Sequence, residues 1–267
     1  MRPVAVTQAS DPRLAPYISI RERDLTGRED GRFIVEGKVT LGILAERSRF
    51  AIESVFIGES RLEPLRSTLE KLPENVPVYV APQTVMDKVA GFPIHRGVLA
   101  CARKGSPLGL EEVTGAETLL VLNGISNHDN VGAAFRNAAA FGVGGVLLDQ
   151  QSCDPLYRKS IRVSAGSALW LPFHHGGTGA DHNAALKDAG YQVWAMTPRA
   201  DATPISQMPV SGRVAVLLGA EGPGLPDTLI GGAKPVRIPM APDFDSVNVA
   251  TAGALALSRI FEARQQV

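Results

Sequence analysis

Hydrophobic residues in the first hundred positions switch between short apolar runs and helical spacing. The runs are rich in β-branched residues and predict strands at 33–36, 51–57, 76–80 and 97–102. Between them, apolar residues recur at three- and four-residue intervals and predict helices at 37–48, 62–72 and 82–89. Strands that alternate with short helices predict a small α/β domain.

The pattern changes after a cluster of Gly, Ser and Pro at 105–109, which we interpret as a linker. The strands predicted beyond it are apolar without alternation, as in strands buried on both faces, and lie at 118–123, 145–148, 192–196, 213–218 and 234–238. Helices are expected at 130–141, 157–165, 183–189 and 246–263. We therefore expect an α/β chain of two domains, residues 1–105 and 106–267, the second built on a parallel sheet covered by helices.

Composition narrows the class of protein without identifying it. The 267 residues are 45% hydrophobic and 20% charged, which is ordinary for a soluble globular protein. The formal net charge is 0, so any affinity for nucleic acid must come from local basic patches. The N-terminus has no apolar signal-peptide region, and no apolar run is long enough to span a membrane, so we expect a cytoplasmic protein without membrane contact.

Cysteine and histidine do not form a metal-binding pattern in the sequence. Cys101 and Cys153 are far apart and neither belongs to a CxxC pair, so we expect two reduced thiols. His174 and His175 are adjacent, so their side chains should diverge on a strand. No ligand pattern surrounds them, and we expect no metal site.

The first segment of chemical interest is 123–142, which predicts a strand, a polar loop and a helix of small residues. Ligands of parallel sheets bind beyond the carboxyl ends of strands, so the loop is well placed for binding. Asn130 stands at the expected helix start, and Arg136 follows among alanines, where its guanidinium should have a partner. The residues alone equally allow an N-cap Asn and an Arg that extends from a core helix to solvent.

The second segment, 214–225, is an apolar strand that ends in a Gly-rich loop holding one acid, Glu221. Glycine lets a backbone approach a ligand closely. The loop lacks the Lys-Ser/Thr of a phosphate-binding loop and the GxGxxG spacing of a dinucleotide site, which argues against a dehydrogenase. A tight turn with a solvated Glu221 is the alternative.

The third segment, 236–256, contains a strand end at Ile238-Pro239-Met240, a polar loop and a long apolar helix. Ser246 is predicted to be the N-cap of that helix. Asn248 would then lie in the first helical turn and face the loop. Simple capping of the last helix is the alternative.

In this order, the three segments resemble the motifs of the SpoU/TrmH-type ribose methyltransferases of the SPOUT class. The matching stretches are Asn-Val-Gly-x-x-x-Arg-Asn-Ala from Asn130, Leu-Gly-x-Glu-Gly-x-Gly-Leu from Leu218, and Ile-Pro-Met followed by Ser-Val-Asn-Val from Ser246. Ala250 stands where many members carry Ser, and both residues are small. Residues 33–37, 78–80 and 95–98 resemble the small substrate-binding domain that many members carry, which is related to ribosomal RNA-binding proteins. The resemblance covers nearly the whole chain.

This resemblance implies a SPOUT fold whose C-terminal part is threaded as a trefoil knot, and a homodimer. It also implies methyl transfer from S-adenosylmethionine to a ribose 2′-hydroxyl of RNA. Ribosomal and transfer RNA both remain open, with ribosomal RNA favoured because a separate docking domain suits a bulky structured target. The cofactor would be bound by eight residues: Leu218, Gly219, Glu221, Gly224, Ile238, Met240, Val247 and Asn248.

The resemblance also assigns catalytic roles. Arg136 would hold a phosphate and stabilise the developing alkoxide, and Glu221 would anchor Arg136 or a backbone loop. Asn130, Ser246 and Asn248 would orient the ribose and Arg136. In the N-terminal domain we expect four basic residues to dock RNA: Arg32, Lys38, Arg47 and Arg49. The alternative function is a module that binds S-adenosylmethionine and RNA without catalysis.

Overall fold

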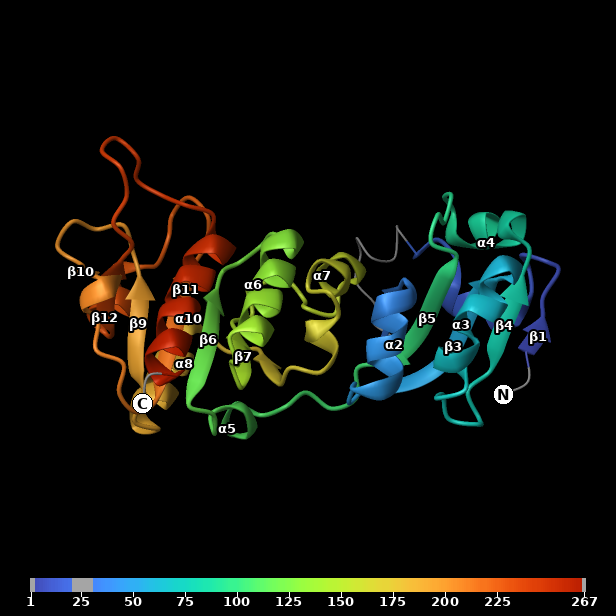
Figure 1. The fold of residues 1–267 in the computed structure, drawn as a ribbon, viewed down its shortest axis with the longest axis horizontal. Coiled ribbons are helices and arrows are strands. Elements are labelled where there is room, and N and C mark those ends of the chain that lie inside the picture. The colour runs from blue at the N-terminus through green and yellow to red at the C-terminus, as the bar shows by residue number, and fades with distance from the viewer. Residues whose placement is uncertain (1–2, 21–30, 266–267) are drawn as a thin grey trace. The chain divides into compact units, whose positions relative to one another are not determined.

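The computed structural model describes residues 3–20 and 31–265. The chain forms two compact units, residues 1–106 with 156–170, and residues 107–155 with 171–267. The predicted division left residues 156–170 with the second part of the chain, whereas the structure packs them with the first. The colouring of Figure 1 traces both units along the sequence.

The first unit is built on a five-stranded mixed sheet in the order β1-β4-β3-β5-β2. β5 runs antiparallel to β2 and β3, and the other pairs are parallel. The strands are β1 (Pro3–Ala5), β2 (Arg32–Glu36), β3 (Ala51–Gly58), β4 (Val78–Ala81) and β5 (Val98–Arg103). The four predicted strands are confirmed. The three-residue edge strand β1 was not predicted, because three residues carry no periodicity.

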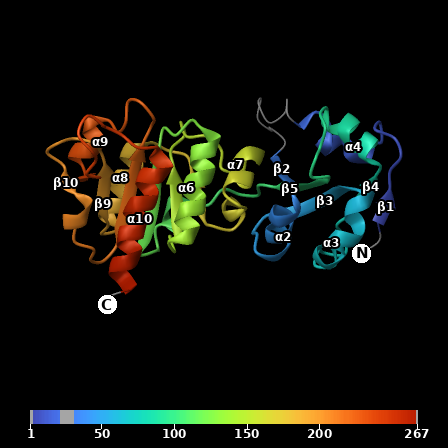
Figure 2. The same ribbon diagram turned by 45° about the horizontal axis from the view of Figure 1, so that its top comes forward.

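Helices cover both faces of this sheet, as Figure 2 shows. They are η1 (Pro12–Tyr17), α2 (Lys38–Glu46), η2 (Glu59–Arg61), α3 (Leu62–Leu69) and α4 (Gln83–Ala90). η1 and α4 bury Tyr17 and Met86 against Phe56 of β3. The Tyr17 and Phe56 rings lie 5.2 Å apart, centroid to centroid. Burial of these large side chains supplies most of the driving force for this face.

Residues 156–170 cover β2, the strand at one edge of this sheet. They form α7 (Arg158–Val163) and η3 (Ser167–Leu169). Glu36 at the end of β2 is buried, and its carboxylate pairs with both Arg158 and Arg162. An unpaired edge strand invites association with other chains, so covering β2 completes the unit.

The second unit is built on a seven-stranded sheet in the order β10-β12-β9-β11-β6-β7-β8, in which every pair is parallel. This confirms the predicted parallel sheet. The strands are β6 (Thr118–Asn123), β7 (Gly145–Leu148), β8 (Phe173–His175), β9 (Gln192–Met196), β10 (Thr203–Pro204), β11 (Val214–Gly219) and β12 (Lys234–Arg237). The apolar strands β6, β7, β9 and β11 are buried along most of their length, whereas β8, β10 and β12 are partly exposed.

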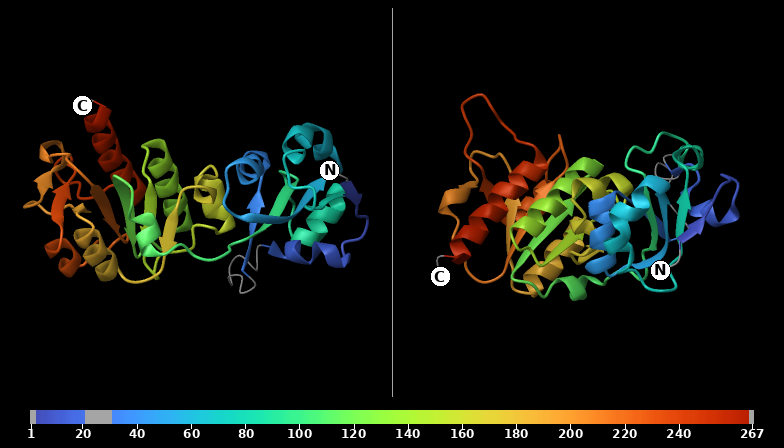
Figure 3. Two further views of the ribbon diagram at one scale, coloured as in Figure 1. Left: turned by 90° about the horizontal axis from the view of Figure 1, so that it is seen from below. Right: turned by 45° about the vertical axis from the view of Figure 1, so that its right-hand side comes forward.

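The helices of the second unit divide between the two faces of the sheet (Figure 3). They are α5 (Leu110–Val113), α6 (His128–Ala140), α8 (Gly179–Asp188), η4 (Ile205–Gln207), α9 (Asp227–Gly231) and α10 (Val249–Gln265). α6 and α10 lie side by side on one face. Leu186 of α8 and Ile230 of α9 pack on the other face against Leu217. The trefoil knot stays a prediction.

Candidate active site

The three segments singled out in the sequence meet at the carboxyl edge of the second sheet. β6, β9, β11 and β12 are parallel neighbours, so their chains all leave the sheet at this edge. Asn123 and Gly219 pair in register at the ends of β6 and β11. Loops that follow parallel strands form the usual ligand site of such sheets.

One hydrogen bond joins the first and third segments. Asn248 Nδ2 donates to Asn130 Oδ1 over 2.9 Å, across 118 residues of sequence. Asn130 is buried in the first turn of α6, where it is fixed by the helix around it. The structure therefore brings together two of the five predicted catalytic residues.

Asn248, and not Ser246, caps the last helix. Asn248 Oδ1 accepts hydrogen bonds from the backbone N–H groups of Ala250 (2.9 Å) and Thr251 (3.3 Å), the pattern of an N-cap. The prediction that Ser246 is the cap is wrong. Ser246 lies in the preceding loop, exposed, with its Oγ bonded to Asp245. Asn248 thus uses its oxygen for the helix and its amide for Asn130.

The cap of α6 also differs from the prediction. Asn127 accepts a hydrogen bond from the Asp129 N–H and starts the helix at His128, so Asn130 lies inside its first turn. Residues seven apart share nearly one helical face, because two turns take about 7.2 residues. Asn137 therefore lies on the same face as Asn130, and its Nδ2 donates to Ala250 O over 2.9 Å. Sequence reasoning missed Asn137, although this spacing would have indicated it.

The Gly-rich loop folds tightly on itself after β11. Gly224 N donates to Ala220 O over 2.9 Å, and Gly222 and Gly224 both have positive φ, 84° and 69°. A Cβ on Gly219 would lie 2.5 Å from the Gly224 carbonyl carbon, which no side chain tolerates. No atom lies within 4 Å of the Cβ positions of Gly222 and Gly224, so this loop presents its backbone to open space.

A buried carboxylate holds the loop between β6 and α6, and sequence reasoning missed it. Asp149 follows β7, is 4% exposed and accepts three hydrogen bonds at Oδ1. The donors are Gly124 N (2.9 Å), Ser152 N (2.9 Å) and Ser152 Oγ (2.7 Å). Ser152 Oγ in turn accepts from Ile125 N over 3.0 Å. Asp149 and Ser152 therefore fix the backbone from which α6 starts.

Arg136 and Glu221 do not pair. Both are exposed, and neither forms a hydrogen bond or ion pair with any residue of the described ranges. Within residues 3–20 and 31–265, Arg136 therefore lacks the expected partner, and Glu221 anchors neither Arg136 nor a backbone loop through a hydrogen bond or ion pair. Arg136 lies six residues after Asn130 and so points away from the helical face that Asn130 and Asn137 share.

The remaining predicted cofactor residues line the strand ends and the last loop. Leu218 is buried at the end of β11, and Gly253 of α10 packs on it so closely that a Cβ there would lie 2.8 Å from Leu218 Cδ1. Ile238 and Met240 are half-buried after β12. Val247 is 38% exposed in the loop before α10. This edge of the sheet thus offers apolar side chains at the strand ends and backbone N–H and C=O groups in the loops beyond them.

Cys153, near this edge, is not activated as a nucleophile. Burial, with a smaller contribution from the carboxylates of Asp154 and Glu221, raises the pKa of the Cys153 thiol to about 11. The thiol is therefore protonated at neutral pH and is a poor nucleophile. No group of three or more metal-ligating side chains occurs within residues 3–20 and 31–265. Over the same ranges, no helix is long and apolar enough to cross a bilayer.

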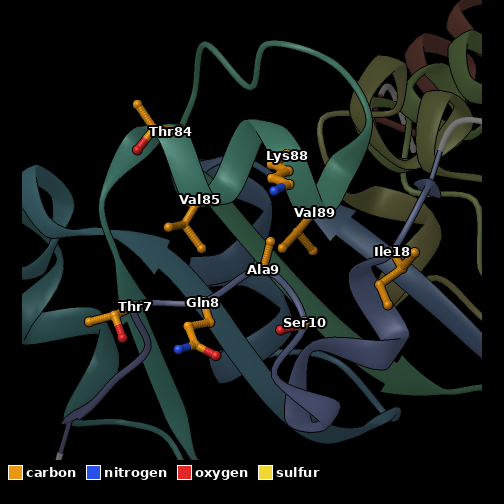
Figure 4. A pocket seen from close by; sticks show the side chains of 9 residues that line it. All are labelled: Thr7, Gln8, Ala9, Ser10, Ile18, Thr84, Val85, Lys88 and Val89. Atoms are coloured by element: carbon orange, nitrogen blue, oxygen red, sulfur yellow. The ribbon is translucent and has the colours of Figure 1, made fainter.

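A surface hollow of about 670 Å³ lies in the first unit. Figure 4 shows it between α4 and the segment that follows β1. It contains none of the predicted site residues. Its lining side chains are Thr7, Gln8, Ala9, Ser10, Ile18, Thr84, Val85, Lys88 and Val89.

Comparison with known proteins shows which family the chain resembles. The model of the SpoU rRNA Methylase family matches residues 117–258. An uncharacterized tRNA/rRNA methyltransferase of Mycobacterium tuberculosis (strain H37Rv) is 37% identical over 263 residues, covering 94% of this chain and 89% of that protein. The 23S rRNA (guanosine-2′-O-)-methyltransferase RlmB of Acinetobacter baylyi is 31% identical over 208 residues, covering 74% of this chain and 83% of that protein.

Solved structures agree on the fold across both units. The AdoMet-bound rRNA methyltransferase of Sinorhizobium meliloti superimposes with a TM-score of 0.78 at 23% identity, covering 99% of this chain and 98% of the other. The SpoU methyltransferase AviRb of Streptomyces viridochromogenes, in complex with AdoMet, also has a TM-score of 0.78, at 20% identity, covering 96% and 100%. The resemblance drawn from the three motifs is confirmed, and the chain belongs to the SpoU rRNA methylase family.

Proposed function

We propose that this protein transfers a methyl group from S-adenosylmethionine to a ribose 2′-hydroxyl of RNA. The observation that carries the proposal is the hydrogen bond between Asn130 and Asn248, which joins the first and third family motifs. The Gly-rich loop of the second motif starts at Gly219, which pairs with Asn123 of the first. Relatives that are named RNA methyltransferases support the same activity. Ribosomal RNA is the favoured substrate class, with transfer RNA as the alternative.

The edge described above fits an adenosyl group. A purine needs apolar contacts on its faces and neutral hydrogen-bonding groups at its rim. Leu218, Ile238 and Met240 supply the first, and the open backbone of the Gly219–Gly224 loop supplies the second. A residue larger than Gly at 219 would disrupt the loop itself. These residues, together with Glu221, Val247 and Asn248, would hold the cofactor.

The protein's part in the reaction is mainly positioning. When bound, S-adenosylmethionine supplies an activated methyl carbon, to which the 2′-oxygen bonds as the carbon–sulfur bond breaks and the hydroxyl loses its proton. Asn130 and Asn248 are already fixed by each other and by their helices, so they can orient the ribose without further ordering. Ser246, exposed in the adjacent loop, would contribute a hydroxyl to the same end.

Arg136 would stabilise negative charge that develops in the reaction and would not accept the proton of the 2′-hydroxyl. A guanidinium stays protonated near neutral pH and does not serve as a base there. Its fork of donors suits a phosphate and the developing alkoxide. The proton would leave through a phosphate oxygen or water. Because Arg136 has no partner among the described residues, its guanidinium is available to the RNA.

We extend the proposal to the assembly and to the place of action. A homodimer is supported by the apolar side chains that α10 exposes, Leu255 (45%) and Phe261 (38%). The first unit would dock RNA, and a cytoplasmic location suits an enzyme that acts on RNA.

The test is methyl transfer from labelled S-adenosylmethionine to separate pools of unmodified ribosomal and transfer RNA. We expect label in the ribosomal pool, and binding of S-adenosylmethionine without binding of NAD. Cofactor binding without transfer to either pool would contradict the enzyme and favour the non-catalytic module.

A further inference from the structure

The basic residues of the first unit lie at two opposite ends of its sheet. Lys38 begins α2 directly after the carboxyl end of β2, whereas Arg47 follows the other end of this nine-residue helix. At 1.5 Å per residue, the two positions are about 13 Å apart. Arg32 is the first residue of β2 and Arg49 shortly precedes β3, both at the same end as Arg47. The four residues predicted to dock RNA therefore do not form one patch.

At the end that holds Arg32, Arg47 and Arg49, the charges are already engaged. Glu53 pairs with Arg32 over 2.5 Å and also with Arg103, its neighbour in the sheet. The guanidinium of Arg47 lies over the Trp170 ring and that of Arg49 over the Phe50 ring, at 4.2 and 4.4 Å from the centroids. A cation that pairs with a carboxylate attracts a polyanion less, and a stacked guanidinium keeps its charge but has one face covered by the ring.

At the opposite end, three exposed basic side chains, Lys38, Arg61 and Arg96, lie close to the strand ends. Gly37 N donates to Val98 O and Gly58 N donates to Gly97 O, both over 3.0 Å, so the ends of β2 and β3 lie beside the start of β5. Arg96 Nη1 lies 3.1 Å from the position of a Cβ on Gly37. Arg61 Nε lies 3.3 Å from that of Gly97. Two guanidiniums thus rest on the glycines of neighbouring strand ends.

The loop that carries Arg96 is held in place before any ligand binds. Ile94 N donates to Asp87 Oδ1 over 2.7 Å, and Gly97 N donates to Ile94 O over 3.2 Å. Arg61 Nη2 donates to His95 O over 3.4 Å, which links the two arginines through the loop. Preorganised donors lose less entropy on binding.

Two of the acids near this end have partners within the fold, whereas Glu59, directly after β3, is exposed. Asp87 accepts from Ile94 and from Gln83, and Glu36 pairs with Arg158 and Arg162. Lys38, Arg61 and Arg96 are exposed and form no ion pair within the ranges that the structure describes. Their positive charge is therefore left for a partner from outside the chain.

We propose that Lys38, Arg61 and Arg96 form the docking site for the phosphate backbone of the RNA substrate. The inference rests on the proposed function, because it takes RNA as the anion. Guanidiniums bind phosphate through paired donors, and the glycines beneath them leave room for its oxygens. Backbone contacts of this kind set affinity and register and leave methylation to the second unit.

The test compares double variants of the full chain that each remove two positive charges. R61Q/R96Q removes both arginines of the proposed site, and the control R66Q/K71Q removes two exposed cations that already pair with Glu63 and Glu46. Binding is measured with in vitro transcribed large-subunit ribosomal RNA at several salt concentrations. We expect R61Q/R96Q to lose on the order of 10-fold in affinity and to flatten the log–log salt slope by about 1.4–1.8. The control should lose less than about 2-fold, because its charges are compensated.

Two controls keep this result distinct from a folding defect or a wrong substrate. Thermal unfolding and S-adenosylmethionine binding should match the wild type in both double variants. Unchanged RNA affinity and salt slope in R61Q/R96Q would overturn the docking site, as would an equal loss in both pairs. A larger loss in R47Q/R49Q would return docking to the other end of the sheet.

Methyl transfer by the wild type separates this proposal from the proposed function. If the wild type transfers methyl groups and R61Q/R96Q binds RNA normally, the docking site is contradicted and the proposed activity stands. If the wild type transfers methyl groups to no RNA but R61Q/R96Q still binds RNA more weakly, the proposed activity is contradicted and the docking site stands.

Discussion

Both units gather their candidate functional groups at one end of a sheet, but they use different chemistry there. In the second unit the side chains are neutral amides, glycines and apolar strand ends, joined by the hydrogen bond of Asn130 to Asn248. In the first unit they are the exposed cations Lys38, Arg61 and Arg96. The first arrangement fixes geometry and the second attracts charge, which are the separate needs of a transfer reaction and of capturing a polyanion.

This difference predicts two kinds of response to mutation. Replacements at the edge of the second unit should lower turnover, and most should also lower stability, because the groups there are bonded to the fold. Replacements at the cationic end of the first unit should lower RNA affinity and its salt dependence, and leave stability unchanged. Arg136 is the sharpest test of the contrast, since it is an exposed cation within the second unit.

Arg136→Ala should have the largest effect. We expect methyl transfer to fall about 10²–10³-fold, as on loss of one donor to a developing anion, with no change in thermal unfolding. Arg136→Lys keeps the charge and loses the fork, so it should recover only part of the rate. Near-normal turnover of the lysine variant, measured with saturating cofactor, would show that the fork is not needed. A pH–rate profile with an arginine-like titration would favour a base instead.

Asn248 separates positioning from capping. Asn248→Ala should lower transfer about 10²-fold, because the ribose-facing amides lose their mutual support, and should cost about 1 kcal/mol of unfolding free energy as the cap is lost. Asn248→Ser keeps a capping oxygen but is too short to reach Asn130. Chemical denaturation should therefore show restored stability while the rate stays low. Recovery of both would mean that Asn248 only caps α10.

Asp149 tests whether the loop before α6 must be held. Asp149→Ala leaves the N–H groups of Gly124 and Ser152 without their acceptor in a buried place, which should cost about 2 kcal/mol. We expect a fall of about 10-fold in transfer from the displaced helix start. Ser152→Ala removes fewer bonds and should show smaller losses in the same urea titration and rate assay. Normal turnover of a folded Asp149→Ala protein would limit this carboxylate to stability.

His182 should give the smallest effect, on stability alone. Burial lowers the pKa of its ring below 6.5, and His174 lowers it further, against a hydrogen bond with Gly176 O. The folded state thus disfavours the protonated ring, so its contribution is full above pH 6.5 and is lost as the pH falls below that value. Between pH 7.5 and pH 5.5, the urea midpoint of unfolding should fall more in the wild type than in His182→Gln. Parallel falls would assign the acid sensitivity elsewhere.

Sequence patterns predicted the central strands of the second sheet well, because a continuous apolar segment must be covered on both faces. The runs 118–123, 145–148 and 192–196 coincide with β6, β7 and β9. Continuous apolar segments exclude solvent-facing alternatives, and ordered motifs at their carboxyl ends indicated the site. The same reasoning did not place α7, because its apolar face shows that the helix is buried but not which unit covers it.

Local polar choices were harder to predict. Ser246 and Asn248 both have capping side chains, and the residue that caps is decided by where the preceding loop becomes helical. Asn127 and Asn130 posed the same question at α6. The absent pairing of Arg136 with Glu221 depends on the path of two loops in space, which no local pattern records. The hydrogen bond between Asn130 and Asn248, which are 118 residues apart in the sequence, forms only once the two helices pack.

The most direct test of the central claim is alkaline hydrolysis of RNA that the protein has labelled with radioactive methyl groups. A 2′-O-methyl group blocks cleavage at its own phosphodiester, so the account predicts label in alkali-resistant dinucleotides. Mass spectrometry of the nucleosides should then show one methylated ribose. Label released in alkali-sensitive mononucleotides would place the methyl on a base, and would contradict the role proposed here for Arg136, Asn130 and Asn248.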